Sequence, residues 1–192
     1  MALNDNAVLT PAVGYIYVAA VDTASPTPAQ IEAFDPDVGL VGWVQLGHTS
    51  RDDLPVFGFD GGDQETRGSW QNASLKRVTT EVAQDYVTFN ALQLDETILS
   101  YYYGVTNPGS TVGKFDVADA STGGIEVAMV IVIVDGDATI GFHASKVSMG
   151  REDSIELAID EFVSVPLRAS ILKSGTNPLF SWLSYDTGVN LT

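Results

Sequence analysis

Few side chains in this sequence of 192 residues have the type and spacing that catalysis requires. There are two histidines, and one of them, His48, lies beside Ser50 and Asp52. A serine nucleophile, an imidazole base and an orienting carboxylate act together only when their side chains converge, which neighbours in sequence do not ensure. We therefore expect His48 to be a polar loop residue. His143 falls on the polar alternation of a strand predicted over residues 139–146, which predicts a solvated position.

Two acidic turns could offer oxygen ligands to calcium, Asp60-Gly-Gly-Asp63-x-Glu65 and Asp135-Gly-Asp137. Neither has the spaced acids and distal bidentate glutamate of a calcium loop, so both are interpreted as turns. Cysteine is absent, which excludes disulfides and thiolate zinc sites. No glycine-rich phosphate loop and no distinct pair of catalytic carboxylates is found. We therefore expect no metal, no cofactor and no enzymatic activity.

Aromatic side chains offer a binding alternative. Trp43, Trp70, Trp182 and the tyrosines at 101–103 could form a platform for a sugar. Large aromatic residues dominate both cores and protein interfaces, so we interpret them as anchors of that kind.

The apolar residues mostly alternate with period two, which predicts a mainly β chain. Residues 75–82 and 86–92 are predicted to pair with each other around Gln84-Asp85, and Asp135-Gly136 predicts a tight hairpin. A further hairpin is expected around Asp60-Gly61-Gly62-Asp63. The predicted strands cover residues 14–21, 42–47, 75–82, 86–92, 114–117, 125–134, 139–146, 155–171 (broken near 162) and 179–185.

Two helices are expected. Thr27 can cap and Pro28 can open a short helix that runs to Phe34. Residues 95–103 begin with an acidic capping residue, Asp95, and precede Gly104, and their apolar side chains Ile98, Leu99 and Tyr102 share one face. The run 127–134 is apolar on both faces, so both must be covered. The core covers one face, and either the 95–103 helix, which we favour, or a neighbouring subunit covers the other.

The charge of the chain is strongly acidic, −16, with 25 acidic and 9 basic residues and no basic residue before residue 51. Such a chain is repelled by nucleic acid and by anionic membranes. Residues 51–77 are an exception, because they carry four basic and five acidic side chains, a net charge of −1. Like-charge repulsion is locally removed in this window, which favours contact with another copy of the chain.

Four segments together suggest a family: MALNDNAVLTPAVGYIYV, TPAQIEAFD, WVQLGHTSRDDLPVFGFDGGDQETRGSWQNASLKRV and DYVTFNALQLDETILSYYYG. The sequence resembles the major tail tube proteins of phages with long, non-contractile tails, and most of all those that infect mycobacteria. A long apolar strand, an Asp-Gly hairpin and DEFVSVPLRASIL later in the chain agree with this resemblance.

The resemblance implies a mainly β fold, a sandwich or barrel of antiparallel strands with one flanking helix. It implies a single domain over residues 1–192, with an N-terminal arm (1–13), a long loop (47–71) and a C-terminal arm (186–192), and no added immunoglobulin-like domain. Subunits would form hexameric rings that stack into a tube, assembled in the host cytoplasm and located in the virion tail. The implied partners are the chain itself, a tape-measure protein in the lumen, tail terminator and tail-tip proteins, and double-stranded DNA in transit, with no membrane.

Two groups of residues are candidates for functional surfaces of such a tube. The charge-balanced window supplies candidates for contacts between rings: Arg51, Asp52, Asp53, Asp63 and Arg67. Glu81, Glu156 and Asp160 fall on polar positions of predicted strands, and we expect them to line the lumen, where acidic side chains would keep DNA sliding.

Three alternatives remain open from sequence. A tube protein of a bacterial injection or secretion machine would share the fold. A monomeric acidic β-sandwich that binds carbohydrate or calcium would need a formed ligand cluster and a secretion signal, and the N-terminus does not resemble a signal peptide. An enzyme would need a catalytic constellation, and none is visible.

Overall fold

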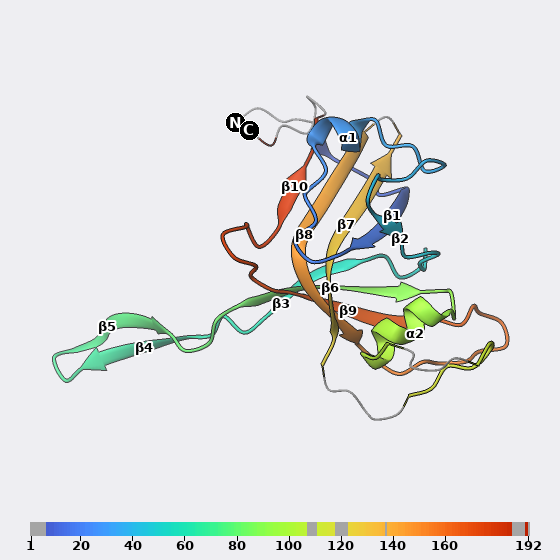
Figure 1. The fold of residues 1–192 in the computed structure, drawn as a ribbon. Coiled ribbons are helices and arrows are strands. Elements are labelled where there is room, and N and C mark those ends of the chain that lie inside the picture. The colour runs from blue at the N-terminus through green and yellow to red at the C-terminus, as the bar shows by residue number, and fades with distance from the viewer. Residues whose placement is uncertain (1–6, 107–110, 118–122, 137, 186–190, 192) are drawn as a thin grey trace.

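A computed structural model of the protein describes residues 7–106, 111–117, 123–136, 138–185 and 191. Within these residues the chain is mainly β, with antiparallel strands and two helices, so the predicted fold class is confirmed (Figure 1). The elements in chain order are β1 (Val13–Ala19), α1 (Pro28–Glu32), β2 (Val44–Gln45), β3 (Val56–Asp60), β4 (Gln64–Ser69), β5 (Asn72–Thr79), β6 (Gln84–Ala91), α2 (Glu96–Tyr103), β7 (Ile125–Asp135), β8 (Ala138–Arg151), β9 (Val165–Ile171) and β10 (Ser181–Leu183).

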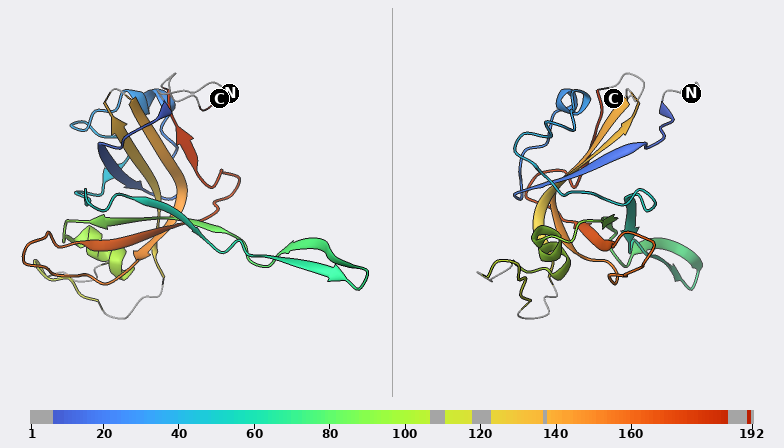
Figure 2. Two further views of the ribbon diagram at one scale, coloured as in Figure 1. Left: turned by 180° about the vertical axis from the view of Figure 1, so that it is seen from behind. Right: turned by 90° about the vertical axis from the view of Figure 1, so that its right-hand side faces the viewer.

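One curved sheet forms the body, with strand order β2-β1-β7-β8-β9-β6-β3. Strand β8 spans both halves of this sheet, because its first part pairs with β10 and its last part pairs with β9. The register of β7 against β8 shifts between Val127 and Met129, and such an irregularity bends a strand. The two halves therefore lie at an angle, as the turned views in Figure 2 show.

The segment after β2 closes the sheet toward a barrel. The amide of Leu46 donates to the carbonyl of Ile16 in β1 at 2.8 Å. A few residues later the amide of Ser50 donates to the carbonyl of Asn90 in β6, also at 2.8 Å. One short stretch of chain thus bridges strands from opposite halves of the sheet.

The main core lies inside this curve. It combines alternate residues of β1, β6, β7, β8 and β9 with one face of α2, including Ile98, Tyr101 and Tyr102. The predicted burial of that helical face is confirmed for Ile98 and Tyr102, whereas Leu99 is only half-buried. The hydroxyl of Tyr102 donates to the carbonyl of Asp153 at 2.8 Å, which ties α2 to the loop after β8.

The outer face of the β7 run is covered by α1, not by α2 or a neighbouring subunit. A second cluster packs Ile31 and Leu40 against Val130 and Val132. The approach is close, because a Cβ added at Gly141 of β8 would lie 2.9 Å from the Ile31 side chain. The prediction that α2 provides this cover was wrong.

Both helices begin at the predicted caps. The Thr27 side chain accepts from the amide of Gln30, whose own side chain accepts from the amide of Thr27, a reciprocal capping box. Asp95 accepts from the amide of Ile98 at 2.9 Å, and Gly104 ends α2 in the left-handed conformation. These signals are local, so they are readable from sequence.

The strand pairing predicted for residues 72–92 was wrong. Strand β5 pairs with β4, and β6 pairs with β3 and β9, because the chain reverses at Trp70-Gln71 and not at Gln84-Asp85. The Asp60–Asp63 segment is therefore no hairpin turn but the link from β3 to β4. Residues 114–117 form no strand, and of residues 155–171 only β9 is a regular strand.

Candidate assembly surfaces

A two-stranded hairpin, residues 64–79, projects from the body, and we call it the arm (Figure 1). Its strands β4 and β5 pair only with each other, and nearly all their residues are exposed. An isolated hairpin is marginally stable in water. The arm therefore gains little from the body and is suited to pack against something else.

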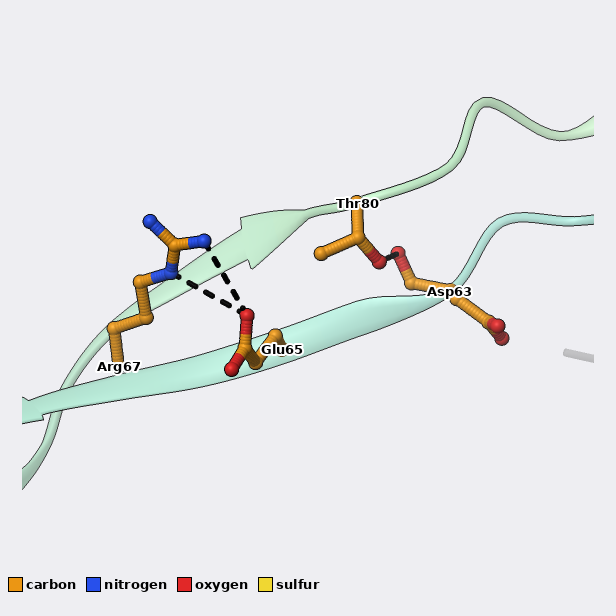
Figure 3. A network of polar contacts seen from close by, with 4 residues as sticks. All are labelled: Asp63, Glu65, Arg67 and Thr80. Atoms are coloured by element: carbon orange, nitrogen blue, oxygen red, sulfur yellow. Dashed lines mark hydrogen bonds and ion pairs between the residues drawn. The ribbon is translucent and has the colours of Figure 1, made fainter.

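Two short connections, which we call the joint, link the arm to the main sheet: Gly61-Gly62 before β4 and Thr80 after β5. Gly61 and Gly62 have φ angles of 73° and 81°, the left-handed region that favours glycine. On the opposite strand, Thr80 clamps the joint, since its amide and hydroxyl donate to the carbonyl of Asp63 at 2.9 and 3.0 Å. Figure 3 shows the contact of the Thr80 hydroxyl with Asp63 beside the ion pair of Glu65 and Arg67 in β4.

The arm is basic, although the chain is acidic. It carries Arg67, Lys76 and Arg77 against Glu65 alone, a net charge of +2, which leaves −18 for the rest of the chain. The Arg67 Nε lies 3.4 Å from the Glu65 carboxylate (Figure 3). Directly opposite Arg67 in the register stands Lys76, a like-charge pair that costs stability within the hairpin.

The root of the arm is held by Arg168 of β9. Its guanidinium forms ion pairs with Asp60, at the end of β3, and with Glu152 at 3.5 Å. It also lies over the ring of Tyr86, 3.7 Å from the centroid. Burial lowers the pKa of Arg168, but the hydrogen bond to Asp60 and the charge of Glu152 outweigh it and raise that pKa, so the cation is permanent.

A cavity of about 290 Å³ lies at the other end of the strands that carry the arm. Strands β3, β6 and β9 contribute Val56, Thr88 to Asn90, Pro166 and Leu167, and the flanking loops contribute Leu54 and the acids Asp53, Glu152 and Asp153. The three acids are exposed. This cavity, which we call the acidic pocket, is lined by both apolar and polar side chains, including the three acids.

A larger cavity of about 580 Å³ lies between β1, β7 and residues 49–57. It is mostly apolar, and among the described residues that line it Arg51 alone is charged. Exposed apolar side chains continue from it along β3, among them Phe59 at 67% exposure. Contiguous apolar surface beside an unpaired strand edge is typical of a protein interface.

The structure distributes the sequence-predicted contact residues over three places. Arg51, Asp52 and Asp53 lie on the body before β3, Asp63 lies at the joint, and Arg67 lies on the arm. Sequence reasoning missed Trp70, Lys76 and Arg77 as members of the arm. The polar alternation of β5 with its two adjacent basic residues was a signal, but the expected pairing with 86–92 concealed it.

The lumen candidates were predicted on regular strands, and the structure places none of the three on one. Glu81 is in the bend between β5 and β6, Asp160 is in a bend, and Glu156 forms only an isolated bridge with Ser164. All three are exposed. The strand alternation on which the prediction depended is absent at these positions, so their orientation toward a lumen stays a prediction.

His143 is buried, so the prediction of a solvated position was wrong. It is 4% exposed and stands edge-on to Trp43, with ring centroids 5.8 Å apart. Burial lowers its pKa, against the opposing effect of a hydrogen bond to the Thr23 backbone. The segment around α1 covers this polar row of β8, which alternation alone cannot show. His48 is exposed, as expected.

Metal binding and membrane spanning find no support in the part of the chain that the structure describes. No group of three or more histidine or acidic side chains there could hold a metal ion. Neither described helix is long and apolar enough to cross a membrane.

An acidic β body that leaves a basic arm and an apolar edge uncovered defines a subunit of an assembly. The chain belongs to the phage tail tube protein family, which it matches over residues 1–192. It is 47% identical over 191 residues to "Major tail protein Gp23" of Mycobacterium phage L5. The aligned residues cover 97% of this chain and 95% of that protein. The same-named protein of Mycobacterium phage D29 is 46% identical over equal coverage. The predicted resemblance is confirmed, and the chain is a structural protein of the virion tail.

Proposed function

We propose that the protein assembles with copies of itself into hexameric rings, which stack into the tail tube that conducts genomic DNA to the host. The projecting arm carries this proposal, because a marginal, exposed hairpin needs a partner surface. Membership of the tail tube family makes a second copy the natural partner. The apolar edge at β3 offers a further surface for a neighbour in the same ring.

The charge distribution supports passage of DNA. Double-stranded DNA carries about one negative charge per 1.7 Å, and a basic wall would hold it by counterion release. The body, with −18 outside the arm, repels phosphates instead. Glu81, Glu156 and Asp160 remain the proposed lumen residues, with the tape-measure protein as the occupant before DNA. Tail terminator and tail-tip proteins would close the two ends, and no enzymatic activity is proposed.

Negative-stain electron microscopy of the purified protein tests this function. Rings or tubes of constant diameter would support it. Dispersed monomers across salt and protein concentrations would contradict it and would favour a monomeric β-sandwich module. The comparisons favour a phage over a bacterial injection machine, since both named relatives are phage tail proteins.

The described part of the N-terminal arm is held against the body by a hydrogen bond. The amide of Thr10 donates to the Asp135 carboxylate at 2.7 Å, which holds the chain before β1 against the β7–β8 hairpin. Residues 1–6 and most of the predicted C-terminal arm lie outside the described residues. Their proposed contacts between subunits rest on the family resemblance alone.

A further inference from the structure

We infer that the arm of one copy docks into the acidic pocket of the next copy, with Trp70 in the cavity and the arm cations on its rim. This inference rests on the proposed self-assembly and names the surface that receives the arm.

The arm lacks partners of its own for the groups it displays. Trp70, at the turn, is 100% exposed. No carboxylate among the described residues forms an ion pair with Lys76 or Arg77. Tryptophan and arginine are enriched among the side chains that anchor interfaces, where a pocket receives the ring and acids receive the cation.

The acidic pocket supplies both. Its apolar lining residues Leu54, Val56 and Pro166 can contact an aromatic ring, and the cavity has a volume of about 290 Å³. Three acids line it and no base does. Arg168 offsets part of this charge, because it pairs with both Glu152 and Asp60, so a charge between −3 and −2 faces the +2 of the arm.

The placement of the two surfaces favours an open chain of contacts. Along the β3–β6 pair, Asp60 and Gln84 stand at the end that continues toward the arm, and Val56 and Thr88 stand toward the pocket. The arm and the pocket thus lie at opposite ends of the same strands. A contact between different surfaces of identical chains can propagate as an open stack when the relation between copies does not close into a ring.

The larger cavity fits the arm less well. Among the described residues that line it Arg51 alone is charged, which would repel the arm cations, and its remaining lining is mostly apolar. Charge complementarity therefore selects the acidic pocket as the receptor.

A charge-swap mixing experiment tests the inference. One variant carries Lys76→Glu and Arg77→Glu on the arm, and the other carries Asp53→Lys and Asp153→Lys on the pocket. Either variant alone presents an arm and a pocket of like charge, so we expect no tubes from it. In an equimolar mixture, native arms can meet native pockets and reversed arms can meet reversed pockets, so we expect tubes, by light scattering and electron microscopy. Circular dichroism checks that both are folded. Tubes from either variant alone at the wild-type rate, or none from a mixture of folded variants, would overturn the inference.

The absence of cysteine permits an independent test by crosslinking. In tubes of Gln71→Cys with Leu54→Cys, which keep the Trp70 indole, mild oxidation should give a ladder of disulfide-linked chains on a non-reducing gel. Gln71→Cys with Val41→Cys is the control, because Val41 is 92% exposed but lies outside the pocket. Tubes without the ladder would overturn this inference and leave the proposed function intact. Absence of tubes from the wild-type protein would instead overturn the proposed function.

Discussion

His143 shows how one covered side chain makes stability depend on pH. Its Nε2 is buried without a hydrogen-bond partner among the described residues, and its pKa is lowered by burial. The unfolded chain, with a histidine pKa of about 6.5, therefore binds the proton more readily than the folded chain. Stability falls as pH drops below that value, with a slope of at most about 1.4 kcal/mol per pH unit.

We predict that His143→Gln reduces this pH dependence. Urea unfolding of the wild type and the variant between pH 7.5 and about 5 should show a smaller loss of stability in the variant, because the titrating group is gone. The matched control is His48→Gln, since His48 is exposed. Equal slopes for all three proteins would show that His143 does not titrate on unfolding in this range.

At the scale of the element, Ile98 is the most deeply buried of the α2 side chains that pack against the body. Ile98 is fully buried in the main core, whereas Thr97 beside it is exposed. Ile98→Ala should lower the free energy of unfolding by about 2–5 kcal/mol, the range for large-to-small changes in a core. Thr97→Ala, the control, should change it by less than about 0.5 kcal/mol. Similar urea midpoints for both variants would mean that α2 contributes little to the core.

The arm should be separable from the body. Asp63 and Thr80 are joined by a 2.9 Å hydrogen bond, so a Gly-Gly link can replace residues 64–79 without stretching the chain. We expect the free energy of unfolding to stay within about 1 kcal/mol of the wild type, because closing a short link costs little. Light scattering should show no tube growth. Long tubes from this folded variant would show that the arm is not a docking element. Deleting residues 52–66 would be a poorer test, since β3 belongs to the main sheet.

At the scale of the whole molecule, charge opposes assembly at long range and favours it at contact. Bodies of −18 repel over the screening length, which is about 30 Å at 0.01 M salt and about 10 Å at 0.1 M. We predict that assembly, followed by light scattering, accelerates between these two concentrations, because screening removes the repulsion between bodies before it weakens pairs in contact. Fastest assembly at the lowest salt would contradict this account.

Much of the fold could be predicted because its signals are local. The caps at Thr27 and Asp95, the left-handed Gly104 and the Asp135-Gly136 hairpin each depend on residues a few positions apart. The continuous apolar run of β7 and the period-two alternation of the first part of β8 located these strands for the same reason. The sequence also determined the acidic charge of the chain and, through its family resemblance, its place in the phage tail.

Only the tertiary structure decided which segments meet. Strand β6 pairs with β3 and β9, the segment around α1 covers β8 with Trp43 against His143, and the basic residues after Trp70 stand on an arm away from the acidic body. None of these follows from alternation, because a strand presents the same backbone donors and acceptors to any partner. Pairing and cover depend on packing between residues distant in the chain. For that reason the charge-balanced window, correctly identified as unusual, divides in space into an arm and a body surface.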